Sequence, residues 1–315
     1  MNYWIRNLLS ALGFLFTVSS FAQTPIDTAL SITIGGISQY VQIKGKNRSA
    51  PLFLFLHGGP GNSAMGYAEK FTSTLQSHFV VVQWDQREAG KTKEINPSQI
   101  PLTVDLFKKD TEEIVHALLK QFHQSKLYIA GHSWGTVLGF HMARTHPEWL
   151  YAYIAISPMI NQLESERIIL ELMKKKAKQN GNKQELNELN SVRIPFGNGA
   201  QLFYQRKWMF DYIGTKVKMS KAYVESWSST WLNLFNTASE ENLFESTPSL
   251  QCPVYFFVGR KDYQTNAELT RKYYEQLIAP KKGFYWFETA HSIPSAAPGL
   301  MQELIINEIL PVTFE

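Results

Sequence analysis

A serine between two glycines is the strongest chemical signal in this sequence. Residues 131–135 are Gly-His-Ser-Trp-Gly, between a short apolar run at 127–130 and an amphipathic segment at 137–144. At a strand-to-helix turn, this motif holds its serine on a tight elbow, and the helix N-terminus faces the negative charge that develops during attack on a carbonyl. The motif predicts Ser133 as a nucleophile for acyl transfer. The alternative is a serine that only caps the following helix.

A nucleophilic serine needs a base and an orienting carboxylate, and in this type of site both follow it in the chain. His291 comes just after the last predicted strand and is the only histidine after His146. Asp262 follows the apolar run 254–258, which places it at the strand edge where parallel sheets carry their active sites. We predict a Ser133, Asp262 and His291 triad. The competing role for Asp262 is a turn or capping residue.

The same chemistry needs two backbone N–H groups that bind the oxyanion. One is expected from Trp134. The other is expected from the His-Gly-Gly-Pro-Gly loop at 57–61, after the apolar run 52–56, and we assign it to Gly59. A phosphate-binding loop is a poor alternative, because the segment lacks the P-loop lysine and the G-x-G-x-x-G spacing.

The elements that must position these residues alternate along the chain. A hairpin is predicted around residues 35–36, and the segment 159–248 is helical, rich in aromatic residues and without strand-like runs. The remaining apolar runs predict buried parallel strands at 52–56, 79–84, 127–130, 151–156, 254–258 and 284–287, with helices at 103–122, 137–144, 266–278 and 299–309. We therefore predict a core of residues 23–158 and 249–315 with a helical cap inserted at 159–248.

The first 22 residues have the composition of a secretory signal peptide. They contain one basic residue, no acid, an apolar centre, and the small residues Ser20 and Ala22 before Gln23. We expect cleavage there and export to the periplasm or the medium; the alternative is an uncleaved anchor. No later run is long enough to span a bilayer, so we expect no membrane partner after cleavage.

Composition excludes several other classes. The net charge is +4, and one basic run at 174–178 alternates with acids, so no nucleic-acid partner is expected. The single cysteine, Cys252, precedes an apolar run, which predicts a buried residue without an intramolecular disulfide. No His, Cys or Asp cluster has ligand spacing, so we expect no metal and no cofactor.

Taken together, the motifs make the sequence resemble the α/β-hydrolase fold, and more narrowly the prolyl-aminopeptidase-like group of serine peptidases. The likeness is carried, in order, by residues 57–61, Trp-Asp-Gln-Arg at 84–87, residues 131–135, residues 259–262 and His291. It implies a mostly parallel central sheet with an inserted helical cap, the triad named above, no cofactor, and a short-peptide or small-molecule substrate. Glu88 departs from the family, which usually has glycine after the arginine.

The substrate is less well defined. Family members that release an N-terminal proline hold its free amine with cap glutamates, often in a W-x-x-W-E pattern. Here Trp227 and Trp231 are spaced differently, and Leu232 stands where that glutamate is expected. The possible substitutes, each otherwise a solvated helix residue, are Glu164, Glu166 and Glu241.

We therefore predict an exported serine hydrolase, an aminopeptidase of the proline type that acts on short peptides. One alternative is a carboxylesterase or amidase that acts on small acyl substrates. Another is a ligand-binding module that has kept the fold without turnover. Dependence on a free substrate amine distinguishes the first two.

Overall fold

The computed structural model describes residues 24–96, 101–215 and 218–314. The predicted signal peptide, residues 1–22, lies outside the described residues. The described chain forms an eight-stranded sheet in the order β1-β2-β4-β3-β5-β6-β7-β8. Its strands are β1 Ile26–Ile34, β2 Ile37–Gly45, β3 Leu52–Leu56, β4 Val80–Trp84, β5 Leu127–His132, β6 Leu150–Ile156, β7 Val254–Gly259 and β8 Lys282–Phe287. β2 is antiparallel to both β1 and β4, and the other pairs are parallel.

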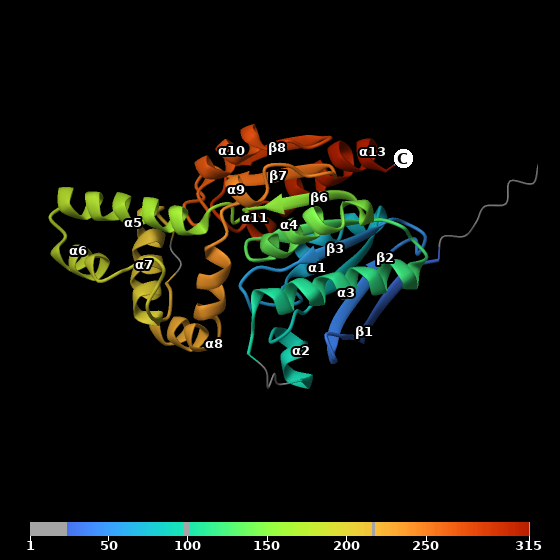
Figure 1. Ribbon diagram of the computed structural model, residues 1–315, viewed down its shortest axis with the longest axis horizontal. Coiled ribbons are helices and arrows are strands. Elements are labelled where there is room, and N and C mark those ends of the chain that lie inside the picture. Colours follow the sequence, from blue (N-terminus) through green and yellow to red (C-terminus); the bar gives the residue numbers. More distant parts are fainter. Residues whose placement is uncertain (1–23, 97–100, 216–217, 315) are drawn as a thin grey trace, which may run out of the picture.

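Helices cover both faces of the sheet (Figure 1). They are α1 Ala68–Thr72, α2 Gly90–Ile95, α3 Val104–Phe122, α4 Gly135–Thr145, α10 Ala267–Gln276, α11 Ile293–Ala296, α12 Pro298–Leu304 and α13 Leu310–Thr313, with short 3-10 turns at Leu75–Ser77 and Pro147–Trp149. The predicted hairpin, the strands and the helix at 103–122 are confirmed. No helix of the described ranges is long and apolar enough to cross a membrane.

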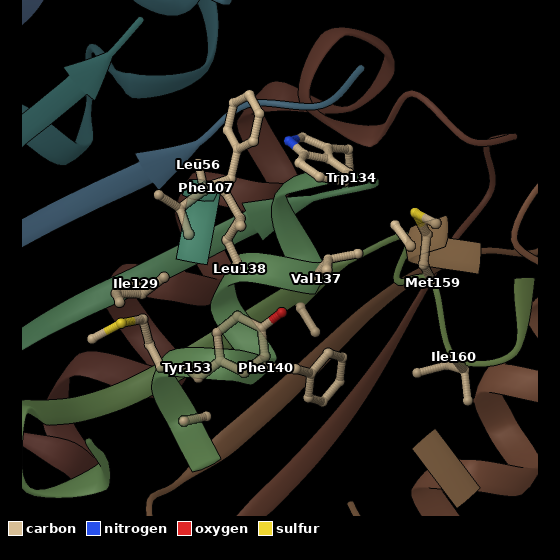
Figure 2. Close-up of a cluster of buried hydrophobic side chains, with 14 of the residues drawn as sticks. Leu56, Phe107, Ile129, Trp134, Val137, Leu138, Phe140, Tyr153, Met159 and Ile160 are labelled. Carbon is tan, nitrogen blue, oxygen red and sulfur yellow. The ribbon is translucent and has the colours of Figure 1, made fainter. Parts of the chain in front are cut away.

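Alternate residues of the central strands supply two separate cores. All five residues of β3 are buried, and because successive strand side chains point to opposite faces, the leucines pack on one side and the phenylalanines on the other. Leu54 joins the cluster under α3 and α4, while Phe53 joins the cluster under α1 and α12. Figure 2 shows the first cluster beside the turn between β5 and α4, where the rings of Phe107 and Trp134 meet edge to face, with ring centroids 5.5 Å apart.

The predicted final helix at 299–309 is interrupted. After α12 the chain forms a π-helical turn at Ile305–Ile309 and then α13. Pro311, near the start of α13, has no N–H to donate to the carbonyl of residue 307, so the regular pattern of helical hydrogen bonds is broken there.

The cap helices stand between β6 and β7 and group at the end of the sheet toward which β6 points (Figure 1). They are α5 Gln162–Gln179, α6 Lys183–Asn190, α7 Gly199–Tyr212, α8 Lys221–Ser239 and α9 Leu243–Ser246. Each begins after an asparagine or serine whose side chain accepts a backbone N–H of the first turn, an arrangement that fixes where each helix starts. These caps are Asn161, Asn182, Asn198, Ser220 and Asn242.

Candidate active site

The turn between β5 and α4 holds Ser133 in a left-handed conformation, with φ at +53°. For a residue other than glycine, such a conformation costs about 1–2 kcal/mol. The surrounding backbone holds it there: the Ser133 N–H donates to the Ile156 carbonyl at 3.0 Å, and the Ser133 carbonyl accepts the Thr136 N–H at 2.8 Å. The serine therefore sits on a sharp elbow, as the motif predicts.

The two glycines of the motif allow the helix to pack directly on the sheet backbone. A Cβ at Gly135 would lie 2.1 Å from the Leu56 carbonyl oxygen, and one at Gly131 would lie 2.5 Å from the Gly135 carbonyl oxygen. Any side chain at either position would push α4 away from β3 and β5 and displace the elbow.

His291 and Asp262 meet as predicted. The His291 Nδ1 lies 2.9 Å from Asp262 Oδ2, and Thr265 donates to the same carboxyl group through its N–H at 3.1 Å and its hydroxyl at 2.9 Å. Burial alone would raise the pKa of Asp262, but the His291 ring and these hydrogen bonds lower it to about 2. The ionised carboxylate therefore accepts a hydrogen bond from the Nδ1–H of His291, which leaves Nε2 without a proton.

The backbone of His291 is fixed against the elbow. Its carbonyl accepts the Ser157 hydroxyl at 2.8 Å and lies 3.1 Å from Nε2 of His132. Burial and the nearby His291 ring lower the pKa of His132 to about 3, so His132 stays neutral and donates from Nε2. The rings of His132 and His291 are 5.2 Å apart. Across the described residues, the hydroxyl of Ser133 has no hydrogen-bond partner within the protein.

The loop at 57–61 lies beside the serine. A Cβ at Gly58 would stand 3.4 Å from the Ser133 Cβ. Within the part of the chain that the structure describes, neither the Gly59 nor the Trp134 backbone N–H donates to a protein acceptor. Both N–H groups predicted as oxyanion donors are therefore available near Ser133.

Helix α8 of the cap rests on this loop. Trp227 Nε1 donates to the Pro60 carbonyl at 3.0 Å, and the Tyr223 hydroxyl donates to Asn62 Oδ1 at 3.2 Å. A Cβ at Gly61 would lie 2.5 Å from the Trp231 ring. The cap thus contacts residues 60–62, at the end of the loop.

Two cavities adjoin these groups. The Gly59 cavity, of about 150 Å³, is lined by Gly59, Asn62, Arg206, Gln264 and cap side chains that include Phe210 and Trp227. The His291 cavity, of about 380 Å³, is lined by Asp262, His291, Phe210, Gln264 and neighbouring residues. Phe210 and Gln264 line both cavities, so both adjoin the same side of the cap.

The three cap glutamates line neither cavity. Glu166 is 1% exposed, and its carboxylate accepts from Arg206 Nη1 at 2.7 Å and Nη2 at 2.5 Å, from Gln162 at 2.8 Å, and from Gln205. All of its oxygens are therefore occupied.

The other two glutamates are paired elsewhere. Glu241 binds Arg144 at 2.8 Å, at the end of α4 opposite the serine, and an 11-residue helix is about 16 Å long. Glu164 forms an ion pair with Arg167 at 3.5 Å, and both side chains are largely exposed.

Arg206 and Gln264 border the Gly59 cavity, and sequence reasoning did not select either of them. Arg206 lies within the aromatic α7, and no motif marks it. Gln264 is two residues after Asp262; its N–H donates to the Asp262 side chain at 3.0 Å, and its carbonyl accepts from Gln162 at 2.8 Å. The described residues contain no group of three or more His, Cys, Asp or Glu side chains arranged to hold a metal.

The family model described as alpha/beta hydrolase fold matches residues 51–273. This chain belongs to the alpha/beta hydrolase fold family. The match extends from β3 through the elbow and the whole cap to Asp262 and α10. The mostly parallel sheet with its inserted helical cap agrees with this assignment.

Several named proteins resemble this alpha/beta hydrolase. The Bacillus subtilis (strain 168) protein named "Probable aminopeptidase YbaC" is 29% identical over 285 residues, which cover 84% of this chain and 90% of the relative. A proline iminopeptidase of Heyndrickxia coagulans is 24% identical, with 84% and 91% covered.

Solved structures support the fold. A proline iminopeptidase-related protein from Thermus thermophilus gives a TM-score of 0.62 at 21% identity, covering 91% of this chain and 98% of that one. An esterase from Pyrococcus furiosus gives 0.61 at 15% identity, with both chains fully covered. The same fold therefore accompanies both peptidase and esterase names.

Proposed function

We propose that this alpha/beta hydrolase is a serine hydrolase with Ser133 as nucleophile, His291 as general base and Asp262 as the residue that orients the imidazole. The observation that carries the proposal is the 2.9 Å contact between His291 Nδ1 and Asp262 Oδ2 beside a serine held at φ +53°. Two available backbone N–H groups, of Gly59 and Trp134, complete the set.

In this mechanism the Ser133 oxygen bonds to the acyl carbon while His291 Nε2 takes the hydroxyl proton. The carbonyl oxygen becomes an oxyanion and accepts hydrogen bonds from Gly59 and Trp134. The intermediate collapses as His291 gives the proton to the leaving amine or alcohol. Water, deprotonated by His291, then attacks the acyl-enzyme and releases the acid, and the proton returns to Ser133.

For the substrate, we propose short peptides from which the enzyme releases the N-terminal residue, with proline as the preferred residue. The names of the full-length relatives support this class. Aromatic side chains of the Gly59 cavity, among them Phe210, Trp227 and Phe235, offer apolar walls suited to a small ring.

A specific observation supports a second candidate, a carboxylesterase or amidase acting on small acyl groups. Of the described residues that line the Gly59 cavity, Arg206 is the only one with a charged side chain. The ammonium group of a substrate with a free N-terminus would lie near the Arg206 guanidinium and be repelled by its like charge. A neutral acyl group is not repelled.

We further propose that the protein acts outside the cytoplasm after removal of residues 1–22. The composition of that segment supports this location. Fractionation of cells, together with N-terminal sequencing of the exported protein, tests it, and an N-terminus at residue 1 would contradict it.

The deciding experiment uses purified mature protein with a free prolyl arylamide, its N-acetyl form and a short-chain aryl ester. Ser133→Ala should abolish turnover and fluorophosphonate labelling, whereas Ser191→Ala, at an exposed cap serine, should change neither. Cleavage that needs the free amine supports the aminopeptidase. Cleavage of the ester or of the blocked amide alone supports the second candidate. A protein that neither turns over nor is labelled is a binding module.

A further inference from the structure

The Trp-Asp-Gln-Arg segment at 84–87 takes no part in the mechanism described above. It ends β4 and continues into the following loop, and its polar residues are almost completely buried: Asp85, Gln86 and Arg87 are each 1% exposed. Burying three such side chains is costly unless each is hydrogen-bonded. Their partners therefore indicate what the segment does.

Three hydrogen bonds of Gln86 go to the two segments that supply the proposed oxyanion donors, while its carbonyl accepts the Ala89 N–H at 3.0 Å. Its side-chain N–H donates to the His57 carbonyl at 3.2 Å, and its side-chain oxygen accepts the Trp134 Nε1–H at 2.9 Å. Its backbone N–H donates to His57 Nε2 at 3.2 Å. His57 is two residues before Gly59, and Trp134 directly follows the nucleophile. One amide group therefore bridges the loop and the elbow.

The residues on either side of Gln86 hold it rigidly. Asp85 accepts the Lys91 N–H at 2.9 Å and the Ser63 hydroxyl. Arg87 binds Asp110 with two donors at 3.0 Å and donates to the Gly35 carbonyl at 3.0 Å. The bridge is thus fixed to α2, α3 and the β1–β2 hairpin, outside the segments it joins.

The imidazole of His57 fits this arrangement. It is 1% exposed, and burial lowers its pKa, which favours the neutral ring. Nδ1 lies 2.8 Å from the Gly58 carbonyl, so Nδ1 carries the proton and Nε2 accepts from Gln86.

We propose that Gln86 is the positioning residue of the oxyanion hole, because it sets the separation of the Gly59 and Trp134 N–H groups by bridging the His57 carbonyl and the Trp134 indole. The inference rests on the proposed Ser133 mechanism. The bridge requires a donor and an acceptor on one side chain. Methionine, of similar size, supplies neither, so Gln86→Met removes the bridge and keeps most of the volume.

The test is the rate at which a fluorophosphonate labels Ser133, because this reaction places a phosphoryl oxygen in the oxyanion hole and needs no knowledge of the natural substrate. Removing one oxyanion donor costs about 10²–10³-fold in kcat, and loosening two donors without removing either should cost about 10–100-fold. We expect that fall in the maximal labelling rate and in kcat for the best substrate. KI and KM should stay within about twofold, because the donors act mainly in the transition state.

A matched control is available on β4, three residues before Gln86. Gln83 is also buried, at 4% exposed, and its side-chain nitrogen has no partner in the described structure. Gln83→Met makes the same chemical change three residues away and should leave labelling and turnover unchanged.

A second variant covers the case in which Gln86→Met unfolds. Trp134→Phe removes the indole donor and keeps both the backbone N–H and the bond from Gln86 to His57. Trp134→Phe should lower the maximal labelling rate and kcat. The fold-loss in the double variant should be smaller than the product of the two single fold-losses, because both substitutions break the same hydrogen bond.

A folded Gln86→Met that is labelled at the wild-type rate would overturn the inference, as would a loss confined to KM or KI. Either result leaves the proposed function intact. A wild-type protein in which Ser133 is neither labelled nor needed for turnover would overturn both.

Discussion

Substituting Arg206 by methionine tests the buried ion pair between Arg206 and Glu166 in the cap. Arg206 lies on α7 and Glu166 on α5, and their side chains are 8% and 1% exposed. The guanidinium supplies two of the four donors on the carboxylate, at 2.7 and 2.5 Å. Methionine keeps much of the volume that packs near Phe196, so the substitution mainly removes the charge and its hydrogen bonds.

The expected loss of stability follows from those contacts. Two hydrogen bonds between charged groups contribute about 1.5–3 kcal/mol each, and removing one partner of a buried ion pair costs about 3–5 kcal/mol. Gln162 and Gln205 remain as donors to the Glu166 carboxylate, so we expect a loss of about 3–4 kcal/mol. That is a large fraction of the roughly 5–15 kcal/mol by which a typical domain is stable.

The assay is urea unfolding at neutral pH, followed by circular dichroism, of wild type, Arg206→Met, Glu166→Gln and the double variant. Because the double variant leaves no unpaired buried charge, its loss should be smaller than the sum of the single losses by about 2 kcal/mol. Arg167→Met is the matched control. That arginine is 52% exposed and pairs with Glu164 at 3.5 Å on the surface of α5, so its removal should cost less than about 1 kcal/mol.

Additive losses in the double variant would refute the coupling, and a fully stable Arg206→Met would refute the buried ion pair itself. The result also bears on specificity. While the pair is intact, the Glu166 carboxylate has no free oxygen for a substrate amine, so Glu166→Gln should leave KM for a free prolyl arylamide within about twofold.

Three further predictions follow from single residues. The pKa of Asp262 is lowered from 3.8 to about 2, and one pKa unit corresponds to about 1.4 kcal/mol. The ionised carboxylate should therefore stabilise the fold by about 2 kcal/mol above pH ~4. This contribution is lost as the pH falls toward 2, so the stability gap between wild type and Asp262→Asn in urea unfolding should narrow there. Burial raises the pKa of Cys252 to about 12, so a thiol reagent at pH ~8 should modify it only after denaturation. Glu88 has φ +58° where the family usually has glycine; Glu88→Gly should raise the free energy of unfolding by up to about 1 kcal/mol, and a loss of similar size in urea unfolding would contradict the strain argument.

The sheet, and the edge of it at which Ser133, Asp262 and His291 lie, were predictable because their signals are local. Each parallel strand holds a short apolar run, and Ser133, Asp262 and His291 each come just after one, so a parallel sheet must bring them to one edge. The buried state of Cys252 was likewise predicted and is confirmed at 2% exposure.

The pairing of Arg206, which lines the Gly59 cavity, with the buried Glu166 was not predictable in the same way. Arg206 and Glu166 are 40 residues apart on different helices, and their pairing depends on how α5 and α7 pack, which helical periodicity does not specify. Nothing in the sequence distinguishes a cap glutamate that binds substrate from one occupied by a neighbouring arginine. The role of Gln86 was hidden for a similar reason, since the motif marks the residue but not its partners.

The contacts between α8 and the loop at 57–61 constrain how this enzyme can be re-engineered. A cap exchanged between related hydrolases is usually taken as the chain segment inserted between two strands of the sheet, here β6 and β7. Here Trp227 and Tyr223 donate to Pro60 and Asn62, which belong to the core. A transplanted cap that lacks those donors would leave Pro60 and Asn62 without these partners, close to Gly59, the proposed oxyanion donor. The cap and this loop should therefore be transferred together. A chimaera in which only the segment between β6 and β7 is replaced would change catalysis along with specificity.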